Sequence, residues 1–404
     1  MGPMPGCLAF SAKAPWMTEG SLIFPIEEFQ NRTVRLQERM SDEGLDALLL
    51  TTPADVFYAT GFLTRFWESP ARPWFVVVPR RGAPVAVIPR IGADLMGRTW
   101  ITDIRTWDAP NPHDDGVGLL GDTLKELTPN AARIGMPSGL ETHVRMPLAD
   151  LERLRATLRD RLIVDGTDAL HRVREIKSDA EVAKIKTSCV IADRAFARVS
   201  EYARAGAPLD HIFRQFQMAL LDEGADWVSY VAGAAAQGGY GDVISPATTA
   251  PLAPGDVLML DTGAVKDGYF CDFNRNFSVG DIDDAVARTH DALWEATGVA
   301  LLDLKPGARA CDVHKMMCDA LAARGLTPGG GRLGHGLGVT LTEWPSFTPL
   351  DTTELRAGMV LTLEPSAEVS PGKILVHEEN IVLREDGPEL LSARAPCEMP
   401  VLAS

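Results

Sequence analysis

Positive charge is what this 404-residue chain lacks most: 39 Lys and Arg residues stand against 55 Asp and Glu, a formal net charge of −16 at pH 7. Such an acidic chain repels phosphate backbones and anionic lipid headgroups, so we expect neither a nucleic-acid partner nor a membrane partner. Long apolar runs and a basic start followed by an apolar stretch are also absent. We therefore expect no transmembrane helix and no signal peptide, and we expect a cytoplasmic protein.

Paired cysteines are absent as well. The six cysteines are scattered, and no two of them form a Cys-x-x-Cys pair, which argues against a thiolate zinc site and against a disulfide framework. No internal repeat recurs along the chain, which excludes a solenoid. The composition, 46% hydrophobic and 23% charged, is that of a globular protein. Because 404 residues exceed what one compact core holds, we expect two domains.

Composition and periodicity divide the chain into three segments. Residues 1–21 are rich in Gly, Pro and Ser and predict a loose arm. In residues 22–160, short apolar runs such as 47–50 and 74–79 alternate with amphipathic stretches, which is typical of an α/β domain. In residues 165–404, helical patterns are mixed with longer extended runs, which predicts an α+β domain.

Two aspartates lie at the ends of neighbouring apolar strands in the second segment. Asp261 and Asp272 flank a short turn, and a carboxylate in such a position costs free energy unless it is paired or bound to a metal. A turn at 266–267 would place Asp261 opposite Asp272, whereas a turn at 267–268 would place it opposite Asn274. Either register leaves the two aspartates on one face of the hairpin.

One histidine and two glutamates follow in similar settings. His335 lies between two glycines, which let the backbone approach a bound group closely. Glu364 and Glu378 each end an apolar run and lie symmetrically about 370–372, so a hairpin there would set them on one face. Two Asp, one His and two Glu supply hard oxygen and nitrogen ligands, which suit divalent Mn, Fe, Co or Zn. Four carboxylates exceed what one tetrahedral ion needs, so the set favours two ions.

This order of residues resembles the pita-bread metallopeptidase family, which contains methionine aminopeptidase, aminopeptidase P, prolidase and creatinase. The resemblance rests on Asp261, on Asp272 in Asp272-Phe273-Asn274-Arg275, on Gly334-His335-Gly336, on Glu364-Pro365 and on Glu378-Glu379. It covers residues 165–404, and residues 22–160 resemble the creatinase-type N-terminal domain. The resemblance implies an α/β creatinase-like N-terminal domain followed by an α+β pita-bread catalytic domain.

The resemblance also implies a dinuclear metal site in a homodimer. One ion would be bound by Asp261 and Asp272, the other by Asp272, His335, Glu364 and Glu378, with Asp272 and Glu378 bridging the pair. A bridging water would supply hydroxide near neutral pH, and Glu364 would carry its proton to the leaving group. Arg275 would hold the ligand carboxylates from behind. The expected substrate is a dipeptide-sized molecule or another small amide, whose C–N bond is hydrolysed.

The sequence departs from the peptide-cleaving members of that family at two positions. They carry a His about 17 residues before the first metal Asp, where residues 242–246 here contain none, and Thr342 stands where they carry a second His after His335. Their two imidazoles bind the scissile amide and its tetrahedral intermediate, and losing one such donor costs about 10²- to 10³-fold in rate. A metal-assisted lyase acting on a small zwitterion such as dimethylsulfoniopropionate is therefore a second hypothesis. A catalytically silent binding protein is a third, against which the five retained ligands weigh.

Besides Thr342, Tyr240 and side chains of the segment 62–74 are candidates for a substrate pocket. Tyr240 lies in a Gly-rich loop, and residues 62–74 place two Trp and two Arg in one loop of the first domain. In relatives that region reaches toward the active site of the partner subunit. Trp67 could face an onium group through a cation–π contact, and Arg65 or Arg72 could bind a carboxylate. The alternative is that the Trp residues pack in a core or a dimer contact and the Arg residues are solvated.

Overall fold

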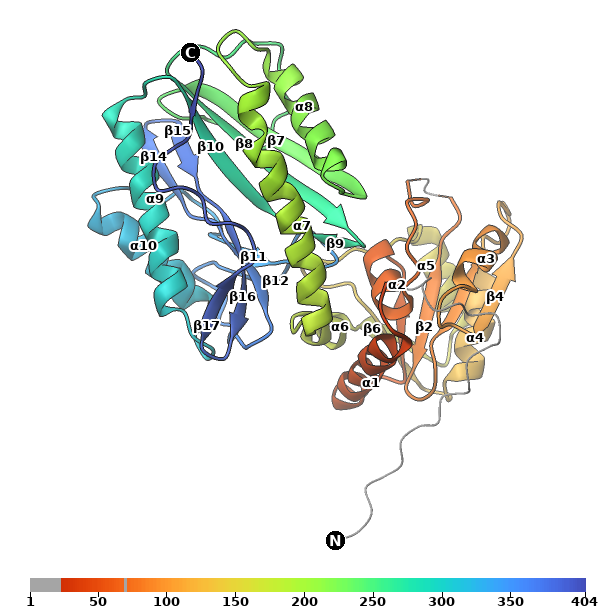
Figure 1. Cartoon of the computed structure of the whole chain (residues 1–404). Helices are drawn as coiled ribbons and strands as arrows, with labels where there is room; N and C mark the ends of the chain where they lie inside the picture. The colour runs from red at the N-terminus through yellow and green to blue at the C-terminus, as the bar shows by residue number, and fades with distance from the viewer. Residues whose placement is uncertain (1–22, 69–70) are drawn as a thin grey trace. The chain divides into compact units, whose positions relative to one another are not determined.

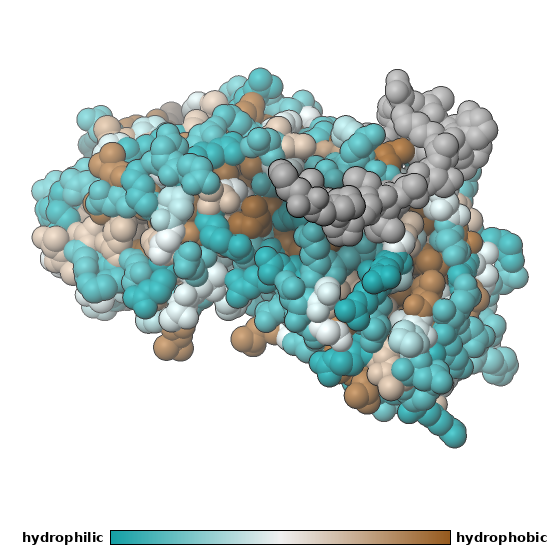
Figure 2. Space-filling view, turned by 90° about the horizontal axis from the view of Figure 1, so that it is seen from below, coloured by the Kyte–Doolittle hydropathy of each residue, from teal (hydrophilic) through white to brown (hydrophobic). Residues whose placement is uncertain are grey.

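The computed structural model describes residues 23–68 and 71–404, so the predicted arm at residues 1–21 lies outside the described part (Figure 1). The contacts within the chain divide it into two units, of which the first ends at Arg174 and the second begins at Glu175. None of the described helices combines the length and the apolar character that crossing a bilayer requires. Hydrophilic side chains predominate on the face that Figure 2 shows, as the composition leads one to expect.

The first unit is built on one mixed six-stranded sheet with the order β4-β3-β2-β1-β5-β6. Its strands are β1 (Ala47–Leu50), β2 (Phe75–Pro79), β3 (Val85–Pro89), β4 (Asp103–Trp107), β5 (Arg133–Met136) and β6 (Leu162–Asp165). Its helices are α1 (Ile26–Asp42), α2 (Pro53–Thr60), α3 (Ala93–Met96), α4 (Val117–Leu127), α5 (Leu148–Thr157) and α6 (Thr167–Arg174), with a 3₁₀ turn η1 (Arg90–Gly92). Every residue of β1, β2 and β3 is buried, because these apolar runs form the middle of the sheet. The α/β prediction is confirmed.

The first unit extends further along the chain than the expected limit at residue 160. Strand β6 pairs with β5 in parallel, with Ile163 opposite Ile134. Helix α6 packs against α1, and Arg174 at its end forms a buried ion pair with Asp55, with Nη1 2.7 Å from Oδ1. These contacts join the segment 162–174 to the first unit rather than to the second.

The second unit contains two five-stranded sheets and a separate hairpin, with helices packed against them. One sheet has the order β18-β10-β8-β7 with β9 paired to β8, the other the order β12-β11-β13-β16-β17, and β14 pairs with β15. The strands are β7 (Trp227–Gln237), β8 (Asp256–Lys266), β9 (Tyr269–Phe270), β10 (Phe273–Val279), β11 (His335–Gly336), β12 (Glu343–Ser346), β13 (Val360–Leu363), β14 (Ser366–Ser370), β15 (Lys373–Val376), β16 (Glu379–Arg384), β17 (Gly387–Leu390) and β18 (Val401–Leu402). The helices are α7 (Asp179–Ala197), α8 (Leu209–Asp222), α9 (Asp284–Asp303) and α10 (Ala310–Ala323), with a 3₁₀ turn η2 (Val199–Glu201). Helices α7 and α8 lie on β8 and β7, whereas α9 lies against β14, β15 and β17 (Figure 1), which confirms the α+β prediction.

Helix α7 is placed on its sheet by a defined start and by one polar residue in its middle. Ser178 accepts a hydrogen bond from the Glu181 backbone and Glu181 returns one to Ser178, a capping box that stabilises the first turn. One side of the helix then faces the β8–β9 hairpin, where Ser188 Oγ donates to the Tyr269 carbonyl oxygen at 2.9 Å. The next residue, Cys189, is fully buried, and its thiol contacts Asn380 of β16. The helix thereby bridges the two sheets.

Candidate metal centre

The β8–β10 hairpin brings Asp261 and Asp272 to one spot. Asn274 pairs with Asp261, which selects the second of the two registers that the sequence allowed. Asp267 and Gly268 form the turn with φ of 52° and 80°, because a two-residue hairpin turn requires positive φ at both central positions. The prediction that the two aspartates share a face is confirmed, since one hydroxyl contacts both carboxylates, as described below.

Glu364 and Glu378 face each other across a second antiparallel pair. Leu363 of β13 pairs with Glu379 of β16, and Ser366 of β14 pairs with Val376 of β15. The two glutamates lie between these paired segments in the same register, so they are directly opposite. Glu364 and Glu378 are equally far from residues 370–372 in the sequence, and the pairing of the hairpin strands keeps that symmetry.

His335 is oriented by its own backbone. Its Nδ1 lies 2.8 Å from the Gly336 carbonyl oxygen, and because a carbonyl only accepts, Nδ1 carries the proton. The other ring nitrogen, Nε2, lies 3.2 Å from Asp272 Oδ2 and is the ring atom left to bind a metal ion. The backbone N–H of His335 donates to Thr362 Oγ1 at 3.0 Å, which ties the histidine to β13.

The five predicted ligands converge on one site. Asp272, His335 and Glu378 are buried and place donor atoms within 4.8 Å of one another. Asp261 and Glu364 are half-buried beside them, so the site opens on their side. Burial, reinforced by the neighbouring carboxylates, raises the pKa of Asp261 and of Glu378 well above the usual value. Burial likewise raises the pKa of Glu364 to about 7, although His335 opposes this shift.

The donor atoms fit one or more divalent cations. Glu378 Oε1 is buried and has no hydrogen-bond partner among the residues that the structure describes, which is costly for a carboxylate unless a cation binds it. The crowded carboxylates repel one another, and a divalent ion would remove that repulsion and lower the pKa of Asp261, Glu364 and Glu378. The ligand set of oxygen and imidazole nitrogen suits Mn, Fe, Co or Zn.

Tyr230 is a residue of this site that the sequence did not reveal. Its hydroxyl lies 3.1 Å from Asp261 Oδ1 and 2.5 Å from Asp272 Oδ1, so it holds both carboxylates. The pairing of β7 with β8 shifts by one residue between Val228 and Val231, and the resulting bulge places two residues, Ser229 and Tyr230, opposite a single partner. Bulges of this kind redirect a side chain, which here points into the site.

Asn380 is a second residue that the sequence did not reveal. Asn380 Oδ1 accepts the Asp272 N–H at 3.0 Å, and its Nδ2 donates to the Asp272 carbonyl oxygen. Asn380 is fully buried and lies two residues after Glu378 on the other sheet. Asn380 therefore fixes the position of Asp272 relative to Glu378.

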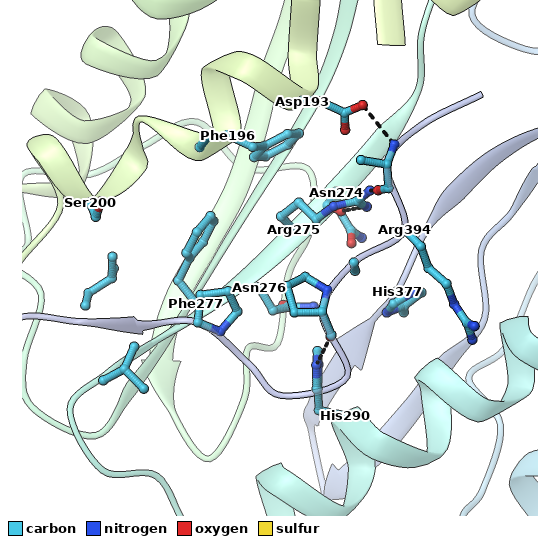
Figure 3. Close-up of a pocket in the computed structure, with 17 residues that line it drawn as sticks. Asp193, Phe196, Ser200, Asn274, Arg275, Asn276, Phe277, His290, His377 and Arg394 are labelled. Carbon is cyan, nitrogen blue, oxygen red and sulfur yellow. Dashed lines mark hydrogen bonds between the residues drawn. The ribbon is translucent and has the colours of Figure 1, made fainter. Parts of the chain in front are cut away.

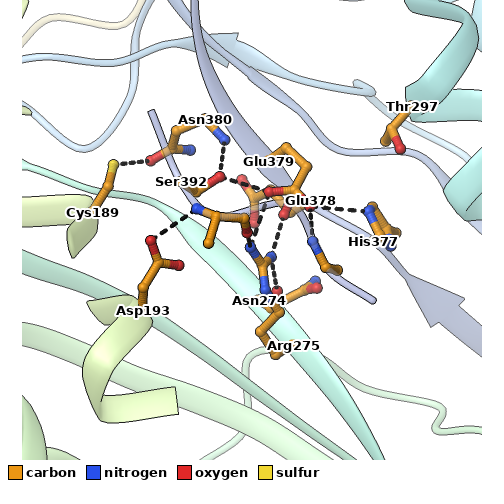
Figure 4. Close-up of polar contacts among 12 residues, drawn as sticks. Cys189, Asp193, Asn274, Arg275, Thr297, His377, Glu378, Glu379, Asn380 and Ser392 are labelled. Carbon is orange, nitrogen blue, oxygen red and sulfur yellow. Dashed lines mark hydrogen bonds and ion pairs between the residues drawn. The ribbon is translucent and has the colours of Figure 1, made fainter. Parts of the chain in front are cut away.

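Arg275 supports the site from behind, as Figure 4 shows. Its Nη1 donates to the Glu378 carbonyl oxygen at 2.8 Å, and its Nη2 lies 2.9 Å from Glu379 Oε2. Burial alone would raise the pKa of Glu379, but Arg275, with His377, outweighs burial and holds this pKa at about 2. Glu379 is thus an ionised partner of Arg275 and points away from the candidate ligands, because successive residues of a strand face opposite sides.

A cavity of about 430 Å³ lies on the Arg275 side of β10 (Figure 3). Its walls are mainly apolar, from residues such as Phe196, Phe277 and Leu402, and His290 and Arg394 lie at its edge. None of the five candidate metal ligands lines it. The cavity therefore borders Arg275, which supports the candidate metal site, and does not reach the candidate ligands themselves.

The candidate pocket residues lie in different surroundings. Thr342 Oγ1 accepts a hydrogen bond from Arg332 Nη2 at 3.2 Å. Tyr240 is 1% exposed, and its hydroxyl donates to Asn276 at 3.0 Å and accepts the Val376 N–H at 2.8 Å. These bonds give Tyr240 a structural role in the core, and its contact with a substrate stays a prediction.

Trp67 and Arg65 belong to the first unit. Trp67 packs against Phe62 and Trp74, with ring centroids 6.4 and 5.6 Å away, and Arg145 lies over its ring at 5.1 Å. This cluster supports the alternative that the tryptophans are packing residues. Arg65 is exposed, 3.6 Å from Glu68. A substrate contact of Trp67 or Arg65 stays a prediction.

Fold and site together define a metal-dependent hydrolase with an α/β domain before its catalytic domain. Residues 183–386 match the model of metallopeptidase family M24, and residues 32–176 match that of the creatinase/prolidase N-terminal domain. The chain belongs to metallopeptidase family M24, which is dependent on divalent metal ions. The pita-bread resemblance noted from the sequence is confirmed.

Similar proteins share the whole architecture. The probable dipeptidase PepE of Mycobacterium tuberculosis is 29% identical over 380 residues, which cover 91% of this chain and 95% of the relative. The putative dipeptidase YkvY of Bacillus subtilis is 26% identical over 366 residues, covering 88% and 96%. The crystal structure of dipeptidase PepE from Mycobacterium ulcerans superposes with a TM-score of 0.82 at 26% identity, covering 94% of this chain and 100% of the other. The crystal structure of X-Pro aminopeptidase from Thermotoga maritima superposes with a TM-score of 0.78 at 24% identity, covering 92% of this chain and 99% of the other. This similarity is one of fold.

Proposed function

We propose that this protein is a dinuclear metal-dependent peptidase that hydrolyses the C–N bond of dipeptide-sized substrates, including those with proline after the scissile bond. The observation that carries the proposal is the convergence of Asp261, Asp272, His335, Glu364 and Glu378, with one carboxylate oxygen of Glu378 left without a partner. The names of the similar dipeptidases support the size of the substrate.

The ligand set divides between two ions in this proposal. Asp261 and Asp272 would hold one ion, Asp272, His335, Glu364 and Glu378 would hold the other, and Asp272 and Glu378 would be shared by both. Bound divalent ions would polarise the scissile carbonyl and lower the pKa of water toward neutrality. His335 enters this arrangement through Nε2, because its Nδ1 is committed to the Gly336 carbonyl oxygen.

Glu364 is the proton carrier of the proposed reaction. It is half-buried at the open side of the site and directly opposite Glu378. The water oxygen forms the new bond to the carbonyl carbon, the C–N bond breaks, and Glu364 moves the proton from the water to the departing nitrogen. Tyr230 holds the carboxylates of Asp261 and Asp272 in place during these steps, and Arg275 holds the backbone of Glu378.

Metal analysis and a substrate panel test the proposal together. We expect the purified, metal-supplemented protein to retain divalent ions and to cleave members of a dipeptide panel that includes Xaa-Pro dipeptides. Asp272→Asn should abolish both properties, because the amide removes the bridging charge. Asp267→Asn is the matched control on the same hairpin, where Asn tolerates the positive φ of 52°. Metal-loaded protein that leaves the whole panel intact would contradict the peptidase assignment.

A lyase acting on a small zwitterion is the second candidate function. The observation that favours it is Thr342, which stands where peptide-cleaving relatives are expected to carry a histidine. The same metal-loaded preparation should be incubated with a panel of sulfonium and quaternary ammonium carboxylates. Turnover there, without turnover of dipeptides, would replace the peptidase assignment. Metal loading without either activity would favour the third hypothesis, a catalytically silent binding protein.

The homodimer and the cytoplasmic location are further inferences, and both rest on the sequence. Light scattering coupled to size-exclusion chromatography measures the mass of the assembly against the 43.7 kDa of one chain. Fractionation of the source cells tests the location. A mass equal to one chain would contradict the dimer.

A further inference from the structure

The cavity on the Arg275 side of β10 has the features of a second binding site. We propose that it binds a small aromatic amine, whose ammonium group contacts Asp193 and whose far end carries a hydrogen-bond donor for His290. The proposal does not depend on the peptidase function, because none of the five candidate metal ligands lines this cavity.

The cavity has the size and the walls of a small-molecule site. Its volume of about 430 Å³ falls within the range of roughly 300–1,000 Å³ that is typical of ligand pockets. Helix α7, strand β10, helix α9 and C-terminal residues between 393 and 402 contribute to its lining. Phe196 of α7 and Phe277 of β10 provide aromatic surfaces (Figure 3), and Leu402 of β18 adds an aliphatic one. These walls favour a flat apolar body, and an aromatic ring packs well against phenylalanine.

Asp193 supplies a negative charge at one end of the cavity. Its Oδ2 accepts the Ala393 N–H at 2.8 Å, and no residue in the described ranges 23–68 and 71–404 forms an ion pair with it. Burial raises the pKa of Asp193 to about 6, and neither the Ala393 N–H nor the charge of Arg275 offsets burial. A cation from outside the chain would compensate this carboxylate.

The two arginines of the cavity wall are committed to other partners. Arg275 Nη1 donates to the Glu378 carbonyl oxygen at 2.8 Å, and its Nη2 binds the carboxylate of the residue after Glu378. Arg394 Cζ lies 3.5 Å from the centroid of the Trp294 ring, and Arg394 Nη2 donates to the Trp294 carbonyl oxygen at 3.0 Å. Neither arginine forms an ion pair with Asp193, so the cavity favours a cation over an anion.

His290 supplies a lone pair at the other end of the cavity. It is 4% exposed, and its Nε2 lies 3.4 Å from the Pro396 carbonyl oxygen, which only accepts, so Nε2 carries the proton. Nδ1 is then an acceptor, and it has no hydrogen-bond partner in the part of the chain that the structure describes. Burial, with a smaller contribution from His377, lowers the pKa of His290 to about 4, so the ring stays neutral near pH 7. A hydroxyl or N–H group of a ligand would satisfy this buried nitrogen.

The order of these groups along the cavity defines the shape of the ligand. Figure 3 shows Asp193 at one end of the labelled lining and His290 at the other, with Phe196 and Phe277 along one side. A ligand with an ammonium group, an aromatic ring and a hydroxyl group in that order meets all three requirements. Tyramine has this order and serves as the probe. Its analogue p-ethylphenol lacks the ammonium group, and phenethylamine lacks the hydroxyl group.

Isothermal titration calorimetry of the metal-loaded protein with these three probes tests the proposal. We expect tyramine to bind more tightly than p-ethylphenol by roughly 10- to 100-fold in Kd, the range of a charge-assisted hydrogen bond, and more tightly than phenethylamine by roughly 2- to 10-fold. Asp193→Asn should remove the first preference, and its amide oxygen can still accept the Ala393 N–H. His290→Phe should remove the second preference and keep the first. Glu201→Gln, which removes a carboxylate of η2 that does not line the cavity, is the matched control and should keep both.

Each other outcome overturns the proposal. Equal binding of tyramine and either analogue, or no measurable binding of tyramine, would show that the cavity does not select an aromatic amine of this kind. This comparison uses the wild type alone, so it decides the ligand class even if a variant fails to fold. An unchanged first preference in Asp193→Asn would place the amine elsewhere, and binding that disappears when the metal is chelated would assign it to the candidate metal centre. Failure to cleave any dipeptide would refute the proposed function and leave this titration unaffected.

Discussion

Replacing Tyr230 by Phe removes one hydroxyl from the candidate metal centre and leaves the aromatic ring in place. That hydroxyl contacts Asp261 at 3.1 Å and Asp272 at 2.5 Å, and it lowers the pKa of Asp261 against the larger effect of burial. Burial and the two carboxylates raise the pKa of Tyr230 itself well above its usual value, so the hydroxyl remains a donor. Tyr230→Phe should therefore make Asp261 harder to ionise and take a hydrogen bond away from Asp272.

The expected size of this effect follows from the geometry. One hydroxyl proton is shared by two carboxylates, so its removal costs about one hydrogen bond to a charged group, or about 1.5–3 kcal/mol. Because the carboxylates must be ionised to bind a metal, the affinity for divalent ions near neutral pH should fall roughly 10- to 100-fold. The deficit should grow as the pH is lowered, since protons compete with the metal for the same oxygens.

Competition titrations with a fluorescent chelator measure that affinity at several pH values. The control is Tyr202→Phe in the same unit, because within residues 23–68 and 71–404 the buried Tyr202 hydroxyl has no hydrogen-bond partner and its removal should not weaken metal binding. Unchanged metal affinity in Tyr230→Phe, or a loss of the same size in Tyr202→Phe, would refute the reasoning. A fall in thermal stability alone would refute it too, since it would make Tyr230 a packing residue.

Two further predictions concern groups around the site. Asn380→Ala should lower the free energy of unfolding by about 2–4 kcal/mol, because both backbone groups of Asp272 lose a buried partner. Urea unfolding measures this change, and a change below about 0.5 kcal/mol would contradict the prediction. Burial raises the pKa of Asp193 to about 6, above its ordinary value of 3.8. Ionisation of a group whose folded-state pKa is raised weakens the fold as the pH rises through that pKa, so Asp193→Asn should raise Tm at pH 8 and have little effect below pH 4. Its amide oxygen can still accept the Ala393 N–H, and an equal shift of Tm at both pH values would contradict the assignment.

The paired glutamates and aspartates show how much of the site local sequence could predict. Glu364 and Glu378 lie symmetrically about one short turn, so the hairpin alone determines that they are opposite. For Asp261 the local pattern allowed two registers that differ by two residues. The turn at Asp267 and Gly268 selected one of them, and both registers kept the carboxylates on the same face because side chains alternate with a period of two.

Tyr230 and Asn380 could not be predicted in the same way. Tyr230 reaches the aspartates because β7 carries a bulge, and a bulge depends on how two strands pair rather than on the residues of one strand. Asn380 contacts Asp272 across 108 positions of the chain. The fit between two sheets decides such a contact, and no spacing within either strand encodes it.

The amino-acid sequence by itself determined five candidate ligand side chains at strand ends and beside glycines, in an order that indicates the family, and two domains of different class. Spacing carries that information because each hairpin is a local structure. Tertiary structure alone decided which neutral groups hold the ligands and where Arg332 and Thr342 meet. Those contacts join segments that local periodicity treats separately, and they form only when the strands and loops pack against one another.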